Sequence, residues 1–195
     1  RHNKVNGLIY ASSSSVYGGN TKMPFSIGDR VDKPISLYGV TKRTNELIAY
    51  SYSHLYGLPT TGLRYFTVYG SWGRPDMAMY TFTDKILNGV AIPVYNHGNM
   101  KRDFTFIDDI IIGTRLAMEK NYPCEIFNLG NNKSENLMDM IGIIENNLGK
   151  KADIDFQPMQ LGDVQESFAD IDNSTELLGY KPTTNIENGI PRFIE

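Results

Sequence analysis

Short apolar runs alternate along the chain with longer segments in which apolar residues recur every three to four positions. Short runs bounded by Gly, Pro or Ser are typical of buried strands, whereas the longer period indicates amphipathic helices. The predicted strands cover residues 5–12, 60–66, 92–95, 125–129 and 154–156. The predicted helices cover residues 36–56, 79–88, 109–120, 135–148 and 174–178. This pattern predicts an α/β chain.

Turn-forming residues mark where these elements begin and end. Residues 18–36 contain three glycines and two prolines and predict a long loop. Ser36, at the end of that loop, can cap the helix that follows with its hydroxyl. Gly57 and Pro59 end that helix. The tail that runs to Glu195 is interpreted as a segment that closes a domain.

Composition narrows the class of protein. The chain has 195 residues, of which 41% are hydrophobic and 21% are charged, as in ordinary globular proteins. Its net charge of −3, without a basic cluster, predicts no nucleic-acid partner. Cys124 is the single cysteine and no metal-ligand spacing occurs, so we predict a cytoplasmic, metal-free protein. No signal peptide or apolar run of membrane-spanning length appears, so no membrane partner is predicted.

Tyr38 and Lys42 are the first candidates for chemistry. They lie four residues apart at the start of a predicted helix, which places them on one face. An ammonium near a phenol favours the phenolate, so such a pair can abstract a proton from an alcohol. A serine hydroxyl from the preceding strand could bind the same substrate oxygen. On any amphipathic helix, however, the same spacing also occurs as a packed ring beside a solvated lysine.

Two neighbouring motifs favour the chemical interpretation. Residues 7–18, GLIYASSSSVYG, read as a strand that runs into a hydroxyl-rich turn, and residues 36–43, SLYGVTKR, follow after a polar loop. From about Val5 to its C-terminus the chain resembles the extended short-chain dehydrogenase/reductase family, the nucleotide-sugar epimerases and dehydratases. The resemblance implies NAD as cofactor and a catalytic triad of Ser13, Tyr38 and Lys42. The cofactor-binding residues that it implies are Ser12, Tyr38, Lys42 and Tyr65.

The resemblance also implies a fold and a division into domains. It implies a partial Rossmann-like doubly wound parallel sheet, built from the strands near 5–12, 60–66 and 125–129, beside a smaller nucleotide-sugar-binding α/β domain. Residues 1–75 would belong to the NAD-binding domain, to which 107–130 return. Residues 76–106 and 131–195 would form the second domain.

A glycine-rich turn after a first strand lets the backbone approach a dinucleotide pyrophosphate, and these 195 residues contain no such fingerprint. Members of the family carry it near their start. The expectation is therefore that the chain is the C-terminal part of an epimerase-like enzyme, that it binds NAD weakly alone, and that the strand 5–12 exposes an unpaired edge.

The second group of candidates follows the strand 60–66. Residues 64–77, RYFTVYGSWGRPDM, place a Gly/Pro-rich loop at a strand end, where ligands bind in open α/β sheets. Alternatively the loop is structural, with Trp72 filling the core and Arg74 held by Asp76. The segment resembles the family's substrate loop, with Ser71 where proline is usual. Thr67 and Arg74 would then bind a sugar carboxylate, because a guanidinium fork matches that group.

Arg102 begins an alternating segment, and its fork could hold a phosphate pair bidentately. The alternative is a surface arginine paired with Asp103. The resemblance implies that Arg102 is a diphosphate ligand and that Val94 and Tyr95 contact uridine. It also implies a nucleotide contact at Asp163 in residues 160–164, QLGDV, where Leu161 stands in place of the usual proline.

These inferences lead to one favoured function. The resemblance implies NAD-dependent epimerisation of a UDP-sugar at C4 through a 4-keto intermediate, with UDP-glucuronate as substrate and a homodimer as assembly. A dehydratase or decarboxylase of the same fold usually has an acidic residue where Ser14 and Ser15 stand. The remaining alternative is an inert or binding-only fragment. A hydrolase is a poor fit because no Gly-x-Ser-x-Gly turn occurs.

Overall fold

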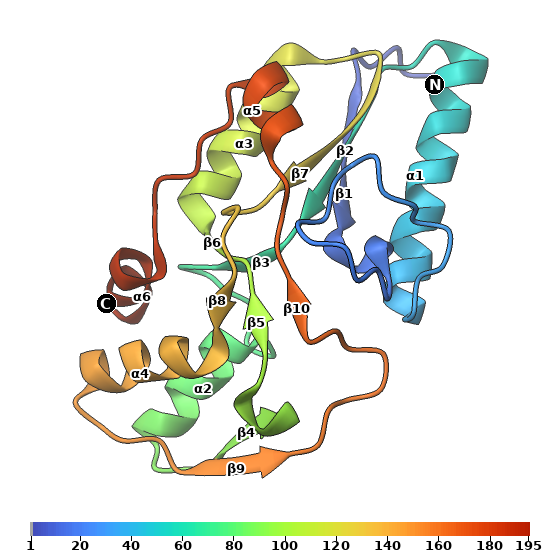
Figure 1. The fold of residues 1–195 in the computed structure, drawn as a ribbon. Helices are drawn as coiled ribbons and strands as arrows, with labels where there is room; N and C mark the ends of the chain where they lie inside the picture. The colour runs from blue at the N-terminus through green and yellow to red at the C-terminus, as the bar shows by residue number, and fades with distance from the viewer. Residues whose placement is uncertain (1) are drawn as a thin grey trace.

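A parallel three-stranded sheet forms the frame of one half of the molecule (Figure 1). In the computed structural model, which describes residues 2–195, its strands are β1 (Leu8–Ser13), β2 (Thr60–Tyr65) and β7 (Cys124–Leu129), in the order β1-β2-β7. Arg1, where the predicted first domain begins, lies outside the described residues. The second edge of β1 is unpaired among residues 2–195, as expected.

Helices cover both faces of this sheet. Helix α1 (Leu37–Tyr56) lies on one face, and α3 (Ile107–Lys120) and α5 (Asp172–Leu178) lie on the other (Figure 1). The Ser36 hydroxyl accepts a hydrogen bond from the Gly39 N–H, which confirms the predicted cap of α1. Gly57 ends the helix in the left-handed region, with φ 61°. The short 3₁₀ helix η1 (Ser14–Tyr17) follows β1 directly.

The other half is built from small helices and strand pairs. Its helices are α2 (Ala78–Leu87), η2 (Asn96–Gly98), α4 (Leu137–Leu148) and α6 (Ile186–Ile194). Its parallel strand pairs are β3 (Thr67–Tyr69) with β6 (Phe104–Phe106), and β4 (Ile92–Tyr95) with β9 (Ile154–Gln157). A further sheet has the order β10 (Glu166–Ser167), β5 (Lys101–Arg102), β8 (Glu135–Asn136).

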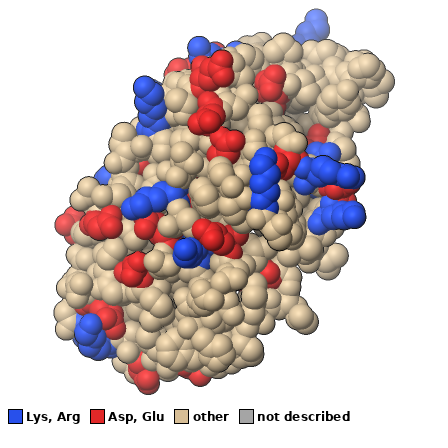
Figure 2. All heavy atoms as spheres, in the orientation of Figure 1, with Lys and Arg blue, Asp and Glu red and all other residues tan. Residues whose placement is uncertain are grey.

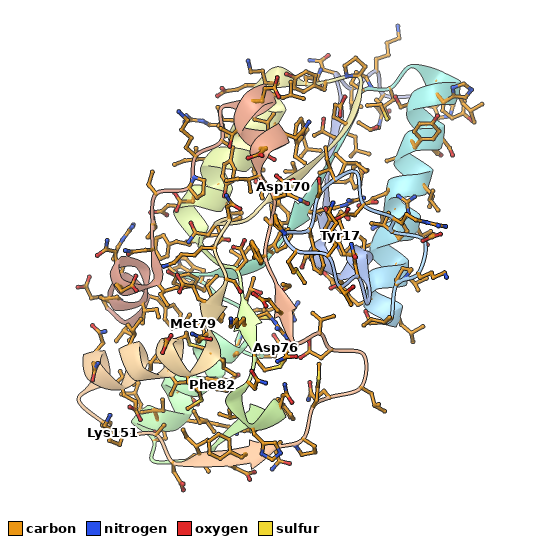
Figure 3. All side chains as sticks on the ribbon, in the orientation of Figure 1. Tyr17, Asp76, Met79, Phe82, Lys151 and Asp170 are labelled. Carbon is orange, nitrogen blue, oxygen red and sulfur yellow. The ribbon has the colours of Figure 1, made fainter. Side chains whose placement is uncertain are left out.

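Each half has its own hydrophobic core, and we call the halves the sheet lobe and the small lobe. Leu63, Phe127 and Ile110 belong to the core of the sheet lobe, and Met140 and Ile92 to that of the small lobe. In Figure 3, the labelled Tyr17 and Asp170 lie in the sheet lobe, and Asp76, Met79 and Phe82 in the small lobe. The predicted domain boundaries stay a prediction. Ala169, Leu178 and Tyr180 nevertheless pack in the core of the sheet lobe, although residues 131–195 were all expected in the second domain.

The chain passes between the lobes several times. Three of the connecting segments, at residues 67, 131–132 and 169, contact Asp103, which is fully buried. Its carboxylate accepts hydrogen bonds from Asn131 N at 2.6 Å, Asn132 N at 3.1 Å and Ala169 N at 3.0 Å. Its carbonyl accepts one from Thr67 N at 3.1 Å. Burial raises the pKa of Asp103 to about 6, although these hydrogen bonds favour the charged form.

Most predicted elements are present within one or two residues of their predicted ends. Differences occur at residues 135–136 and in the tail, and two alternatives considered for Trp72 and Asp103 are excluded. Residues 135–136 form a strand rather than the first turn of a helix, and the tail contains α6. Trp72 does not fill the core, because it is fully exposed. Asp103 does not pair with Arg102, because its carboxylate is occupied by backbone N–H groups.

No helix among residues 2–195 is both long and apolar enough to cross a membrane. No group of three or more His, Cys, Asp or Glu side chains in the same residues is arranged to hold a metal ion. On the face shown in Figure 2, acidic and basic side chains are interspersed.

Candidate active site

The hydroxyl-rich turn that follows β1 forms one wall of the site. Ser13, at the end of β1, accepts a hydrogen bond from Ser15 N at 3.2 Å and lies 3.1 Å from the Ser15 hydroxyl. It thereby caps η1 and is nearly buried. Because β1 is parallel to β2, and β2 to β7, this turn lies at the carboxyl end of the sheet, where ligands bind in such folds.

The first turns of α1 form the opposite wall. Gly39 allows α1 to lie close to η1, since a Cβ at that position would lie 2.6 Å from the Ser15 carbonyl oxygen. The neighbouring Tyr38 is 53% exposed, so its hydroxyl is accessible from solvent. The Lys42 ammonium lies 5.5 Å from the centroid of the Tyr38 ring and donates to the Ala11 carbonyl at 3.1 Å. The structure therefore brings the predicted triad of Ser13, Tyr38 and Lys42 to one end of the sheet.

Two adjoining pockets extend from this end into the small lobe. The nearer one, of about 170 Å³, is lined by Ser14, Ser15 and Ser36 among others. The farther one, of about 470 Å³, is lined by Met77, Phe82 and Tyr95 among others. Thr67, Arg102 and Asp163 line both pockets. A single elongated ligand can therefore contact the serine turn at one end and the small lobe at the other.

Arg102 lies where these pockets meet. Its Nη2 donates to the Asp163 carboxylate at 2.8 Å, and its Nη1 donates to the carbonyl of Gln165 at 3.1 Å. Burial lowers the pKa of Arg102, and the Asp163 carboxylate opposes that shift. The two residues predicted to contact the nucleotide thus contact each other. A partly buried cation at the junction of two pockets is suited to binding an anionic group.

Thr67 is the first residue of β3 rather than part of a loop, and only Arg74 lies on the Gly/Pro-rich loop, which follows β3. Arg74 forms a bidentate pair with Asp76, with Nε–Oδ1 at 2.7 Å and Nη2–Oδ2 at 2.9 Å, and both side chains are exposed. The hydrogen bond and charge of Asp76 raise the pKa of Arg74, and Tyr38 adds a smaller effect in the same direction.

Three predicted binding residues turn their side chains away from the pockets. The Ser12 hydroxyl donates to Glu46 at 2.6 Å and is buried, and the Tyr65 hydroxyl lies 3.0 Å from that of Thr114. Val94 is buried in the core of the small lobe, so only its backbone can reach a ligand. The roles predicted for these residues remain predictions, and Ser12 and Val94 can fulfil them only through main-chain atoms.

Other lining residues were not identified from the sequence. Met77, Phe82, Met100 and Leu137 line the larger pocket. These apolar residues read as ordinary core residues in the sequence, and nothing around them marks the side that faces a ligand. Gln160 lies in the quoted loop QLGDV, whose position beside the pocket could have been inferred from Asp163.

The sequence also matches known proteins. Residues 1–130 match the family model described as "NAD dependent epimerase/dehydratase family". Protein CapI of Staphylococcus aureus is 48% identical over all of this chain, which covers 64% of that relative. The probable UDP-glucuronate 4-epimerase of Rhizobium meliloti is 43% identical over 96% of this chain and 61% of that relative. The chain therefore spans about three fifths of the length of these curated relatives.

The fold matches solved structures as well. The UDP-glucuronic acid 4-epimerase of Bacillus cereus, solved with UDP-glucuronic acid and NAD, superimposes with a TM-score of 0.93 at 35% identity. The match covers 98% of this chain and 61% of that one. The UDP-glucose 4-epimerase of Thermotoga maritima, solved with UDP-glucose, superimposes with a TM-score of 0.93 at 29% identity.

Proposed function

Because the chain belongs to the NAD dependent epimerase/dehydratase family, we propose that the whole protein epimerises a UDP-sugar at C4 and that its favoured substrate is UDP-glucuronate. The observation that carries the proposal is that Ser13 ends β1 and that Tyr38 and Lys42 begin α1, next to Ser14, Ser15 and Ser36, which line a pocket together with Arg102. The similarity to UDP-glucuronate 4-epimerases supports the choice of sugar.

The groups at the carboxyl end of the sheet fit one end of NAD. The Lys42 ammonium has three N–H donors, one of which reaches Ala11 O, so it retains donors for a ribose diol. The Tyr38 hydroxyl is exposed beside it. The glycine-rich turn that a pyrophosphate requires is not among these 195 residues, so the fit concerns the nicotinamide–ribose end.

The proposed mechanism assigns a task to each side chain. Ser13 donates a hydrogen bond to the sugar 4-oxygen, and Tyr38 takes the proton from that hydroxyl as general base. The Lys42 ammonium lies beside this side chain, 5.5 Å from the centroid of the Tyr38 ring. Bound NAD supplies a reversible hydride acceptor for sugar C4. After the 4-keto sugar has turned over, Tyr38 returns the proton to the 4-oxygen.

Arg102 would hold the nucleotide end of the substrate. Its guanidinium faces both pockets, and its present partner is the Asp163 carboxylate. A diphosphate would replace one anionic partner with another, so the charge of Arg102 stays compensated in both states. Thr67, which lines both pockets, would bind the sugar between the two ends.

Replacing Tyr38 tests the chemical step. In the protein that carries the activity, Tyr38→Phe should abolish epimerisation, because only the transferable proton is lost. Binding of UDP-glucuronate, measured by calorimetry, should stay nearly unchanged. Tyr50→Phe is a matched control, because Tyr50 is an exposed tyrosine on the same helix. Near-normal turnover of Tyr38→Phe would remove Tyr38 as the base.

A binding-only fragment is the second candidate function for the 195-residue chain, and the missing glycine-rich turn favours it. Separate calorimetric titrations with NAD and with UDP discriminate between the two. A fragment that only binds should take UDP through the Arg102 pockets and take NAD very weakly. Micromolar affinity for NAD would instead favour a self-sufficient enzyme. Ser14 and Ser15, where dehydratases and decarboxylases of this fold have an acidic residue, argue against those reactions.

We propose a homodimer as the assembly, with α1 as its interface. The outer face of α1 exposes large apolar side chains, among them Leu47, Ile48, Tyr50 and Leu55. Contiguous exposed apolar surface of this kind is typical of a surface that binds another protein. A second copy of the same helix offers a matching apolar face, as a two-fold interface requires.

A further inference from the structure

A row of buried polar residues crosses the sheet just before its carboxyl end. Ser12 of β1, Arg64 of β2 and Asn128 of β7 are direct partners in the strand register. Each is at most 2% exposed. Burying a guanidinium inside a sheet is costly unless its hydrogen bonds and its charge are satisfied. The charge of Arg64 must therefore be compensated by a neighbouring group.

Glu46 of α1 compensates the charge of this row. The Arg64 guanidinium donates to both oxygens of the Glu46 carboxylate, from Nε to Oε1 at 2.8 Å and from Nη2 to Oε2 at 2.9 Å. The carboxylate also accepts from the Ser12 hydroxyl at 2.6 Å and from Arg43 Nη1 at 2.9 Å. Burial alone would raise the pKa of Glu46, but the Arg64 fork and the Ser12 hydroxyl hold it below its usual value. The carboxylate is therefore an anion with four donors.

The network continues toward the turn that contains the serines. Arg64 Nη1 donates to the Tyr17 hydroxyl at 3.0 Å, and its guanidinium lies 4.9 Å from the centroid of the Tyr17 ring. Tyr17 donates to Asn128 Oδ1 at 2.7 Å. The Asn128 amide then donates to the carbonyls of Phe25 at 2.8 Å and Asp170 at 3.0 Å. One hydrogen-bond network therefore joins α1, all three strands and the end of η1.

This network is attached directly to the elements that carry the proposed catalytic groups. Glu46 lies four residues after Lys42 and eight after Tyr38, on the same side of α1. Ser12, its partner, immediately precedes Ser13. Lys42 makes a second tie, to the carbonyl of Ala11. Helix α1 thus forms hydrogen bonds with two successive residues of β1, Ala11 and Ser12, which directly precede Ser13. These two hydrogen bonds set both the rotation of α1 about its axis and its position along β1.

Stability alone is a poor explanation for such an arrangement. A buried ion pair often contributes no more to stability than well-packed apolar side chains of similar volume would. A bidentate ion pair instead restricts geometry, because its two parallel hydrogen bonds form in only one relative orientation of the two side chains. Catalysis depends on such alignment, since a displacement of about 1 Å can reduce a rate about 100-fold.

We propose that Glu46 and Arg64 are positioning residues: their buried ion pair holds Tyr38 and Lys42 of α1 in register with Ser13 of β1. Neither side chain contacts the substrate; they act through the helix and the strand that they join. The placement of α1 against β1 is inferred from the geometry alone. The effect of that placement on turnover rests on the proposed function.

Three variants separate positioning from stability. Glu46→Gln keeps the shape but removes the charge that the Arg64 fork requires. Glu46→Met with Arg64→Met replaces the pair by apolar side chains, which should recover much of the stability. Asp109→Asn is the control: Asp109 is another buried carboxylate, 2% exposed, which accepts from the N–H groups of Thr183 and Thr184 and belongs to α3 on the other face.

The first measurement is the kinetics of the active protein with UDP-glucuronate, at a temperature at which every variant is folded. Glu46→Gln should lower kcat about tenfold or more and leave KM within about twofold, because the substrate's nucleotide end is bound at Arg102. The double methionine variant should stay slow although its melting temperature recovers. Asp109→Asn should melt earlier with kcat unchanged. Recovery of kcat together with stability in the double variant would overturn the proposal.

The second measurement does not depend on activity. A crystal structure of Glu46→Gln should show α1 displaced against β1, with a changed distance between Lys42 Nζ and Ala11 O from the present 3.1 Å. An unshifted helix would overturn the proposal whatever the kinetics show. If the unaltered protein epimerises no UDP-sugar, the proposed function fails, and the variant structure alone then decides whether Glu46 positions the helix.

Discussion

At the residue scale, the role proposed for Arg74 distinguishes between two substrates. Its guanidinium is held by Asp76 in an exposed pair, which was the structural alternative considered from the sequence. Exposed pairs of this kind contribute little to stability, so Asp76 can release Arg74 to a stronger partner at low cost. A sugar carboxylate bound in the larger pocket would be such a partner, because Asp76, which holds Arg74, lines that pocket.

Removing the Arg74 side chain should therefore affect two sugars differently. Arg74→Ala should reduce kcat/KM for UDP-glucuronate at least about tenfold more than for UDP-glucose, which has no carboxylate. The measurement is kcat/KM for both sugars in the wild type and the variant. Asp76→Ala is the control, since it frees the guanidinium without removing it. Equal losses for the two sugars would show that Arg74 only holds the loop.

Single residues were predictable where a local motif carries them. Ser13, Tyr38 and Lys42 lie in two short sequence motifs, so their meeting could be expected from a resemblance. Glu46, Arg64 and Asn128 were not found, because their partners are distant in the chain. Nothing within a few residues of Arg64 indicates that Glu46 of another element neutralises it. Such pairings depend on strand register and helix placement, which the sequence pattern does not specify.

At the element scale, α1 illustrates what a pattern can establish. Its start at Ser36 and its end at Gly57 follow from local capping chemistry and were predicted. Helix α6 was not predicted, because Gly189 and Pro191 weaken its helical pattern. Its apolar Ile186 and Ile190 pack in the core of the small lobe, so tertiary burial outweighs the poor propensity.

Two glycine-to-alanine changes should act in opposite directions. Gly39→Ala places a Cβ 2.6 Å from the Ser15 carbonyl, so α1 and η1 must separate, at a cost of about 1–3 kcal/mol. Gly142→Ala, in the interior of α4, meets no atom within 4 Å and should stabilise the protein by about 0.5–1 kcal/mol. Urea denaturation of the two variants and the wild type measures both changes. A neutral Gly39→Ala would mean that the contact between α1 and η1 is loose.

At the scale of the whole molecule, the exposed apolar face of α1 predicts self-association. Ile48→Glu with Leu55→Glu, seven residues apart on one face of α1, should shift sedimentation of the chain toward the monomer. Ile111→Glu with Met118→Glu is the matched control on α3, where both side chains are also exposed. If the α1 variant associates as strongly as the wild type, the unpaired edge of β1 is the better candidate for the contact.

The contacts of several connecting segments with Asp103 restrict how the small lobe could be exchanged by recombination or by protein engineering. The small lobe is not one continuous stretch of sequence, because its strands, helices and core residues come from separate parts of the chain. A single recombination event therefore cannot exchange it for another lobe, since every junction must change at once and still supply the N–H groups around one buried carboxylate. Under the proposed function, a changed sugar preference is therefore expected from point substitutions along the pockets rather than from grafting a module.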